Sequence, residues 1–338
     1  MCVRWGDVVS NTFSVQNGVK QGGVISPVLD NIYIDNLLET LRKLGYGCYM
    51  GNVFSGAIGY ADDLVLLSPS LYVLRSMIKV CEKYAHDYDI LFNPKKSKLM
   101  CFNVDDTSTI NITLCKKPVE IVDNVQYLGN VVSLDICNRH IDSIVQNFWY
   151  KHNCLRGSFN MANSRTLCRL HSTYCSNVYG SELFNFNCNY VNKLFTAWRK
   201  SIRQLHGVHY RTHNFIVHSL SENIKIKLHR KLANFILSMI NSNNTYVTSM
   251  VMLLFTCSSS MLAENYRYLS YVYGISPSDW ENGNVCVLKK IKSTECLTND
   301  QTISISVVKE LIDMRDNLSC NFATGHEIDI LLQEVCIK

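Results

Sequence analysis

The feature that most constrains the fold of this 338-residue chain is a change of pattern near residue 134. Before that point, short β-prone runs, tight turns and one long apolar stripe predict strands mixed with helices. From 136 to about 270 the chain has no proline, and its apolar residues recur at helical spacing. We therefore predict an α+β chain with three regions: the mixed residues 1–133, the helical residues 134–270, and residues 271–338, to which we assign no role.

Local signals place the individual elements. Ser26-Pro27 favours a helix start, because a serine side chain can cap the free amides and proline fits the first helical position. An apolar stripe follows and Gly45 supplies a stop, so we predict an amphipathic helix over 27–44. Two β-prone runs, 53–58 and 64–67, predict a hairpin connected by residues 59–63. The other expected elements are a helix over 71–86, a strand over 98–103, two or three strands within 110–133, and helices near 163–178, 189–205 and 222–241.

Composition narrows the class of protein. A hydrophobic content of 47% is enough to bury a core, so we expect a globular chain. No apolar run approaches the roughly 18 to 20 residues that a membrane span requires, and the first residues lack the apolar stretch of a secretory signal. We therefore predict an intracellular protein of the nucleus or cytoplasm that is neither secreted nor embedded in a membrane. The net charge of +5 permits a polyanionic partner, although the basic clusters within 95–98, 199–203 and 225–231 are also typical of solvated surfaces.

The 15 cysteines do not indicate a disulfide scaffold. Their number is odd, they are spread along the chain, and no two form a Cys-x-x-Cys pair. We expect free thiols in a reducing compartment. Cys168, His171 and Cys175 would line one face of a helix, but without a fourth ligand nearby their spacing does not favour zinc.

The adjacent aspartates Asp62 and Asp63 are the most informative residues for function, because the predicted hairpin places both at its tip. Two acids against apolar strands are costly unless their charge is compensated. Hard cations such as Mg²⁺ prefer carboxylate oxygens and keep positions open for phosphate, and nucleotidyl transfer uses two such ions. Aspartate is also a favoured turn residue, so the dipeptide by itself is compatible with an ordinary polar turn.

A second feature is the glycine-rich segment from Gly18 to Gly23, which precedes the predicted helix start at Ser26. Glycine allows the close approach of another molecule, and a helix start presents unpaired N–H donors that can bind phosphate. Taken alone, the segment could also be a capped loop. The order in which the motifs occur favours the functional interpretation.

These ordered motifs resemble those of reverse transcriptases from LINE-like retrotransposons, which lack long terminal repeats. The order is Gly18-x-x-Gln21-Gly22-x-x-x-Ser26-Pro27, a long helix, Tyr60-Ala61-Asp62-Asp63, Asn93-Pro94-Lys95-Lys96-Ser97 and Tyr127-Leu128-Gly129, matching motifs B, C, D and E of the family. The resemblance is strong over residues 3–133 and looser over 134–240. It implies the later part of a polymerase palm, an antiparallel sheet with flanking helices, followed by a thumb-like helical region.

The resemblance implies a role for each matching residue. Asp62 and Asp63 would bind the catalytic Mg²⁺ or Mn²⁺, and Lys96 would lie near the nucleotide phosphates and donate a proton to the leaving pyrophosphate. The segment Tyr127-Leu128-Gly129 would grip the primer, although a core tyrosine beside a turn glycine would give the same sequence. Residues expected to contact the template, the primer end or the nucleotide are Gly18, Gln21, Gly22, Ser26, Pro27, Tyr60 and Ala61.

The match is incomplete at its start. The family requires a further aspartate well upstream of the Gln-Gly loop, and Asp7 is the only acid before Gly18. Its context, Arg4-Trp5-Gly6-Asp7, resembles the segment just before the loop, so the first catalytic aspartate and the fingers are missing from these residues. Because loss of a metal-binding carboxylate is costly for activity, we predict that this polypeptide alone does not polymerise DNA.

We therefore predict a fragment of an RNA-directed DNA polymerase that acts, in the full enzyme, on an RNA template, a DNA primer and deoxynucleoside triphosphates by a two-metal mechanism. The alternative is a non-catalytic nucleic-acid-binding remnant, in which the loop from His206 to His213 supplies cationic and stacking groups. That loop could also be a surface loop without a ligand. A third possibility is a chain that does not fold stably, because a palm without its first strand leaves an unpaired sheet edge.

Overall fold

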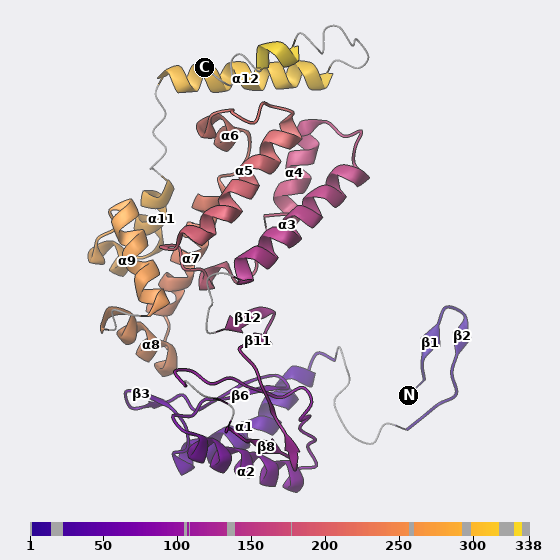
Figure 1. Cartoon of the computed structure of the whole chain (residues 1–338), viewed down its shortest axis with the longest axis vertical. Coiled ribbons are helices and arrows are strands. Elements are labelled where there is room, and N and C mark those ends of the chain that lie inside the picture. The colour runs from indigo at the N-terminus through magenta and orange to yellow at the C-terminus, as the bar shows by residue number, and fades with distance from the viewer. Residues whose placement is uncertain are drawn as a thin grey trace. The chain divides into compact units, whose positions relative to one another are not determined.

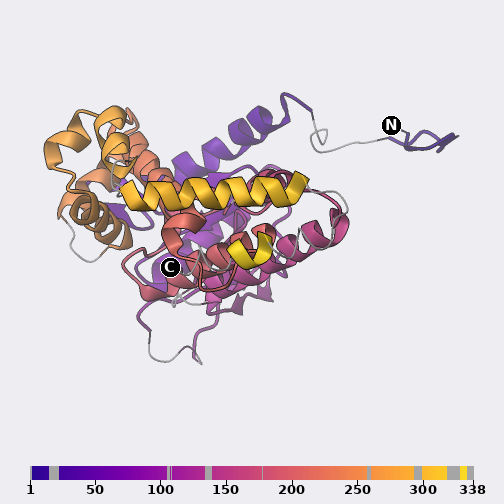
Figure 2. The ribbon, with the colours of Figure 1, turned by 90° about the horizontal axis from the view of Figure 1, so that it is seen from above.

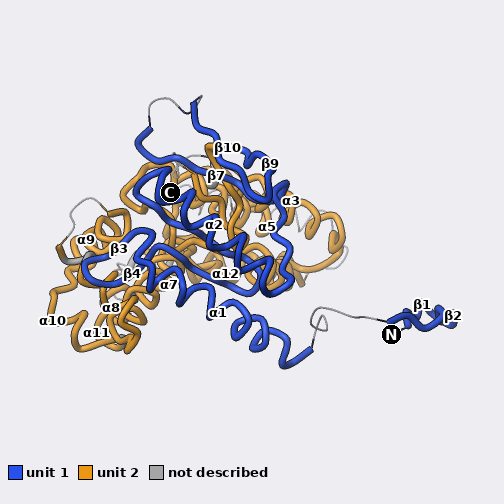
Figure 3. The backbone as a smooth tube through the Cα atoms, turned by 90° about the horizontal axis from the view of Figure 1, so that it is seen from below, with its two compact units in different colours: residues 1–122 blue, residues 123–338 orange. Residues whose placement is uncertain are grey.

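The computed structural model describes residues 2–14, 23–104, 107, 109–133, 139–176, 178–256, 260–292, 299–317 and 328–332. The chain divides into two compact units, unit 1 (residues 1–122) and unit 2 (residues 123–338), which Figure 3 colours separately. Most strands belong to unit 1, and most of unit 2 is helical (Figure 1). The predicted α+β class is confirmed, whereas the description as a palm and thumb stays a prediction. No helix in these ranges is both long and apolar enough to cross a membrane.

Unit 1 has its core between helices α1 (Ser26–Leu44) and α2 (Leu71–Asp87), which agree with the two helices predicted there. Burying a leucine or methionine side chain contributes on the order of 1.5 to 3 kcal/mol, so the apolar side chains buried between α1 and α2 hold the two helices together. Burial also raises the pKa of the Cys81 thiol to about 12, which keeps it protonated in the core. The fully or nearly fully buried residues of this core are Leu37, Leu41, Met77, Cys81 and Tyr84.

The first turn of α1 differs from the prediction. Ile25 occupies the N-cap position with helical backbone angles (φ −89°, ψ −15°), and no side chain caps the helix. Ser26 is therefore the first helical residue and not the cap that the sequence predicts, because the chain already turns helically one residue earlier. At the other end, Gly45 adopts the left-handed conformation (φ 70°) and ends the helix as predicted.

The strands are short and form six two-stranded sheets among the described residues. Five pairs are antiparallel and one, β7 with β10, is parallel. The pairs are β1 (Arg4–Trp5) with β2 (Val8–Val9), β3 (Tyr49–Met50) with β4 (Val53–Phe54), β5 (Ala57–Tyr60) with β6 (Asp63–Leu66), β7 (Lys98–Leu99) with β10 (Glu120–Ile121), β8 (Thr113–Leu114) with β9 (Lys117–Pro118), and β11 (Asn124–Tyr127) with β12 (Asn130–Ser133).

The predicted strand over 98–103 is wrong in its length, since β7 ends at Leu99. The backbone at Asn103 has φ 56°, in the left-handed region, which an extended strand cannot contain. Strands are present within 110–133 as predicted, but there are five short ones, β8 to β12, where two or three were expected.

The hairpin formed by β5 and β6 packs against α1 and the core of unit 1. Leu64 and Leu66 contact the buried cluster between α1 and α2. A Cβ atom at Gly59 would lie 3.3 Å from Cδ1 of Leu38, so glycine is the residue that lets strand and helix come this close without a shift. The hairpin is therefore anchored along its length by the two predicted helices.

Unit 2 consists of the hairpin β11–β12 followed by helices. The predicted helices near 163–178, 189–205 and 222–241 correspond to α4, α5 and α7, with a short 3₁₀ turn before α5. The helices are α3 (Arg139–Ser158), α4 (Ser164–Tyr174), η1 (Ser181–Leu183), η2 (Asn189–Val191), α5 (Asn192–His206), α6 (Asn214–Leu220), α7 (Ile224–Ile240), α8 (Thr245–Thr256), α9 (Met261–Tyr273), α10 (Pro277–Glu281), α11 (Asn284–Lys292) and α12 (Asn299–Asn317).

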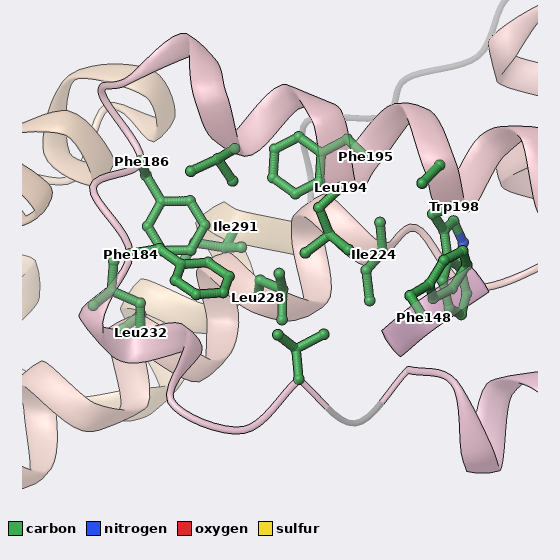
Figure 4. Packing of buried hydrophobic residues seen from close by; sticks show 14 of the residues in the cluster. Phe148, Phe184, Phe186, Leu194, Phe195, Trp198, Ile224, Leu228, Leu232 and Ile291 are labelled. Carbon is green, nitrogen blue, oxygen red and sulfur yellow. The ribbon is translucent and has the colours of Figure 1, made fainter. Parts of the chain in front are cut away.

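The core of unit 2 gathers around α5 and α7. Leu228 and Leu232 of α7 are at most 1% exposed and face aromatic residues that include Phe184 and Phe186 (Figure 4). Trp198 of α5 is also buried, and its Nε1 donates a hydrogen bond to the carbonyl oxygen of Glu222 at 3.0 Å. Glu222 lies two residues before α7, so this bond ties α5 to the start of α7.

Helix α12 joins unit 2 through a second apolar cluster. Ile305, Val308 and Ile312 of α12 pack with Ile216 of α6, and the long helix lies at the α6 end of the unit in Figure 1 and is seen from above in Figure 2. The side chain of Asp313 also pairs with Arg165 of α4 at 2.9 Å. The described residues of 299–332, for which we predicted no element, thus pack against the helices of unit 2.

Candidate active site

The two aspartates lie at the tip of the β5–β6 hairpin, as predicted, but the connection is shorter than expected. Tyr60 pairs with Asp63 across the strands, so only Ala61 and Asp62 form the turn. Ala61 has φ 51°, a left-handed conformation that costs an alanine roughly 1 kcal/mol or more. Two-residue hairpin turns need such angles, which explains why the strain is present. Asp62 thus lies in the turn itself, and Asp63 is the first residue of β6.

Both aspartates are exposed to solvent, as is Tyr60, with 61% of its surface accessible. The sequence argument that the acids are costly because they lie against apolar strands is therefore wrong, since the apolar side chains of β6 pack toward the core while the acids stay in water. Two free, adjacent carboxylates fit a role in Mg²⁺ binding, because this ion usually keeps several waters and takes one or two carboxylates together with substrate phosphates. Within the described ranges no third acidic, histidine or cysteine side chain joins them.

Lys96 lies in the turn that follows α2. The backbone N–H of Lys96 donates to the carbonyl oxygen of Asn93 at 3.1 Å, and that of Lys95 donates to Oδ1 of Asn93 at 3.0 Å. The Asn93-Pro94 turn is therefore formed as predicted, and Lys96 is exposed. Among the described residues, no hydrogen bond or ion pair joins Lys96 to either aspartate.

The residues of the predicted template-contacting loop are only partly described. Ser26 and Pro27 form the first turn of α1. Gly18, Gln21 and Gly22 lie outside the described residues, so their predicted contacts with template and nucleotide stay predictions.

The predicted primer-gripping segment forms the tip of the β11–β12 hairpin in unit 2. Tyr127 pairs with Asn130, and the turn between them consists of Leu128 and Gly129, with φ angles of 46° and 76°. The hydroxyl group of Tyr179 donates a hydrogen bond to the carbonyl oxygen of Leu128 at 3.0 Å. Sequence reasoning missed this contact, because nothing in a single sequence links two residues that are 51 positions apart.

The loop proposed for nucleic-acid binding is only partly available at the surface. His206 is 5% exposed, and its Nε2 lies 2.9 Å from Sγ of Cys168. Its inclusion among the surface groups was therefore wrong, because the last turn of α5 points this ring into the unit. The rest of the loop forms an exposed group: Tyr210 is 70% exposed, its ring lies 4.3 Å from that of His209, and the Arg211 guanidinium lies 5.4 Å from the Tyr210 ring centre.

Cys168, His171 and Cys175 are all buried in unit 2 and do not converge on one point. Cys168 contacts His206, whereas Nε2 of His171 lies 3.1 Å from the hydroxyl oxygen of Ser201. Burial raises the pKa of Cys168 to about 12, which opposes the thiolate form that zinc requires. These side chains act as core residues in the described structure.

Comparison with known proteins agrees with the motifs. Residues 4–132 match the family described as reverse transcriptase (RNA-dependent DNA polymerase). The retrovirus-related Pol polyprotein from type-2 retrotransposable element R2DM of Drosophila melanogaster is 34% identical over 95 residues, which are 28% of this chain and 8% of that protein. The retrovirus-related Pol polyprotein from type-1 retrotransposable element R2 of Popillia japonica is 34% identical over 93 residues, which are 27% of this chain and 15% of that protein.

The similar segment thus spans a small part of either polyprotein. The matched family range contains the exposed Asp62-Asp63 hairpin, Lys96 and the 127–129 turn, in the order that the motifs predict. The resemblance inferred from the motifs is confirmed: residues 4–132 match the reverse transcriptase family, and the similar proteins are Pol polyproteins of retrotransposable elements.

Proposed function

We propose that this chain is part of an RNA-directed DNA polymerase, which joins deoxynucleotides to a primer on an RNA template. The observation that carries the proposal is the strained two-residue turn that exposes Asp62 and Asp63 together within a reverse transcriptase domain. Strained backbone persists where the surrounding structure enforces it, and it is concentrated at functional sites. Here the packed β5–β6 hairpin enforces it.

Each residue of the site has a proposed task. Asp62 and Asp63 would hold divalent metal ions, and such ions, when bound, would supply positive charge for the transfer of a nucleotide to the primer 3′-hydroxyl group. Lys96 donates a proton to that pyrophosphate. The 127–129 turn holds the primer. Residues proposed to contact the template, the nascent base pair or the primer end are Gly18, Gln21, Gly22, Ser26, Pro27, Tyr60 and Ala61.

We further propose that these 338 residues do not polymerise DNA by themselves. In the family, a third carboxylate upstream of the Gln-Gly loop completes the metal site, and Asp7 is the only acid before that loop here. Metal binding by Asp62 and Asp63 is then expected to be weak but measurable, whereas primer extension requires the missing groups.

Metal binding tests the role of the aspartates independently of activity. Titration with Mn²⁺, followed by electron paramagnetic resonance, should show a site whose affinity falls about tenfold or more in Asp62→Asn. The matched control is Asp35→Asn, which removes an exposed aspartate from α1 in the same unit and should leave the affinity unchanged. Equal affinities in wild type and Asp62→Asn would refute the proposed site.

Primer extension tests the proposed inactivity. With Mg²⁺ or Mn²⁺ and a primed RNA template, the chain alone should add no nucleotides. Incorporation that disappears in Asp62→Ala would show that the 338 residues suffice, and would support the site while overturning the proposed inactivity.

A second candidate function, metal-independent binding of single-stranded nucleic acid, is favoured by the exposed Tyr210 with His209 and Arg211 around it. Such a cluster can stack on a base and contact phosphate. Binding of single-stranded RNA should then weaken steeply with salt, and Tyr210→Ala should weaken it by about fivefold or more, whereas Tyr271→Ala, at a tyrosine that is 90% exposed in α9, should not. Absence of binding at low salt would eliminate this candidate.

A further inference from the structure

The tip of the β11–β12 hairpin is held by a loop from the helical part of unit 2. The Tyr179 hydroxyl group binds the carbonyl oxygen of Leu128 at 3.0 Å, and the Tyr179 ring lies 3.3 Å from the point where a Cβ of Gly129 would be. One side chain therefore touches both residues of the turn. A hydrogen bond combined with ring packing restrains the turn in two directions.

The next residue of that loop makes an even closer approach. Gly180 has φ 71°, and a Cβ atom there would lie 1.8 Å from Oδ1 of Asn130. The side chain of Asn130, the first residue of β12, thus occupies the space that any other residue at position 180 would need. Tyr179 and Gly180 together enclose the turn from Leu128 to Asn130.

The loop itself is fixed to α7. The ammonium group of Lys231 donates to the carbonyl oxygen of Val178 at 3.0 Å and pairs with Glu182 at 3.1 Å. Val178 is 6% exposed and belongs to the core of unit 2. A continuous set of contacts therefore runs from the hairpin turn through residues 178–182 to a buried helix.

We propose that Tyr179 and Gly180 are positioning residues for the primer. They hold the backbone of the 127–130 turn in one conformation, and Lys231 links residues 178–182 to α7. The inference rests on the proposed role of this hairpin in holding the primer. Neither residue needs to touch the nucleic acid, because the turn does so. A flexible turn with two left-handed residues would otherwise sample several conformations, and a loosely held primer end loses the alignment that catalysis needs.

Amide hydrogen exchange tests the restraint on the turn. In Tyr179→Phe the ring packing remains and only the hydrogen bond to Leu128 is lost. Exchange at residues 127–130 should accelerate about fivefold, the factor that a net hydrogen bond of this kind contributes to an equilibrium. Exchange in α7 should stay unchanged and serves as the internal reference for folding. Tyr271→Phe in α9 is the matched control and should alter neither region.

A second variant keeps the test decisive if the first is poorly folded. Lys231→Met removes the two polar contacts that fix residues 178–182, keeps an unbranched side chain, and should accelerate exchange at 127–130 in the same way. Unchanged exchange at these residues in both variants would overturn the inference.

Photochemical cross-linking separates the inference from the proposed function on which it rests. A primer with a photoreactive 3′-terminal nucleotide, annealed to RNA, should cross-link to residues 124–133 of the wild-type chain. In Tyr179→Phe the yield should fall several-fold while the total affinity for the duplex is nearly unchanged, a split that a general loss of stability would not produce. No cross-link to this hairpin in the wild type would refute its primer-holding role. The hydrogen-exchange experiment contains no nucleic acid, so it tests the restraint on residues 127–130 independently of that role. An undiminished cross-link in Tyr179→Phe would refute the positioning role.

Discussion

At the scale of single residues, backbone conformation decides which side chains the site can use. Ala61 and Leu128 both adopt left-handed φ angles, although neither is glycine, and each stands in the two-residue turn of a hairpin that carries predicted site residues. At Gly180 the same conformation coincides with an approach that leaves no room for a side chain. Ala61 and Leu128 therefore already carry a side chain in this conformation, whereas a side chain at position 180 would collide with Asn130.

Gly180→Ala should destabilise unit 2 by roughly 2 to 3 kcal/mol, because the left-handed backbone adds strain and the new Cβ displaces Asn130. Gly274→Ala is the matched control: its φ is 58°, but nothing lies within 4 Å of the new Cβ, so only the backbone cost of about 1 kcal/mol is expected. Chemical denaturation of the two variants measures the difference. Equal losses of unfolding free energy in the two variants would show that the side chain of Asn130 does not restrict which residues fit at position 180.

What the sequence could predict depends on whether the signal is local. The tip position of Asp62 and Asp63 was predictable, because two β-prone runs flank them in the chain. Asn265 was not: it is fully buried, its Oδ1 accepts from the N–H of Phe186 at 2.9 Å, and its Nδ2 donates to the carbonyl oxygen of Phe184 at 2.6 Å. Its partners lie about 80 positions away, and a polar residue in an amphipathic helix is ordinarily assigned to the surface.

At the scale of elements, helices were predicted well and short strands were not. The apolar stripes of α1, α2, α5 and α7 repeat over several turns, so their ends were missed by only a few residues. Most strands have two residues, which is too short for an alternating pattern to be recognised. Their position depends on pairing with distant residues, as for Lys98 with Glu120 in the parallel pair.

The helices of unit 2 also bury four histidines, His152, His171, His206 and His229, which are at most 5% exposed. Burial lowers the pKa of all four, to about 3 for His171 and His229 and to about 4 for His206. In the unfolded chain these rings titrate near 6.5, so between about pH 6.5 and 3 the unfolded state binds more protons. The free energy of unfolding is therefore greatest above about pH 7 and falls as the pH decreases through 6.5.

Lowering the pH from 7.5 to 5.5 should reduce the stability of unit 2 by roughly 4 kcal/mol, about 1.3 kcal/mol for each of His171, His206 and His229, and the lowered pKa of His152 acts in the same direction. Urea denaturation at the two pH values measures the drop. In His229→Gln the drop should be smaller by about 1 kcal/mol, whatever the effect of the substitution on absolute stability. Met252→Gln, at an exposed position of α8 in the same unit, should leave the drop unchanged. A drop of the same size in wild type and His229→Gln would contradict this account.

At the scale of the whole molecule, the two units have cores of different size. Unit 2 has an extended cluster of buried residues from α3 to α11 and a second cluster at α12, whereas the described core of unit 1 lies mainly between two helices. Unit 1 also leaves an apolar surface at the start of α1 uncovered. Its exposed residues, 50 to 94% accessible, are Val24, Ile25, Val28, Leu29 and Ile32.

This asymmetry predicts how the units behave when separated. Residues 123–338, expressed alone, should unfold in a cooperative transition, because the buried clusters lie entirely within that range. Residues 1–122 should bind a hydrophobic dye and aggregate, since a small core must stabilise a unit with a contiguous exposed apolar surface. Val28→Ser combined with Ile32→Ser should reduce dye binding and aggregation of this fragment, whereas Tyr72→Ser, at an exposed position of α2 outside that surface, should not. If 123–338 lacked a cooperative transition while 1–122 melted sharply, the main folding nucleus would have to lie in residues 1–122, and the helical unit would depend on it for its structure.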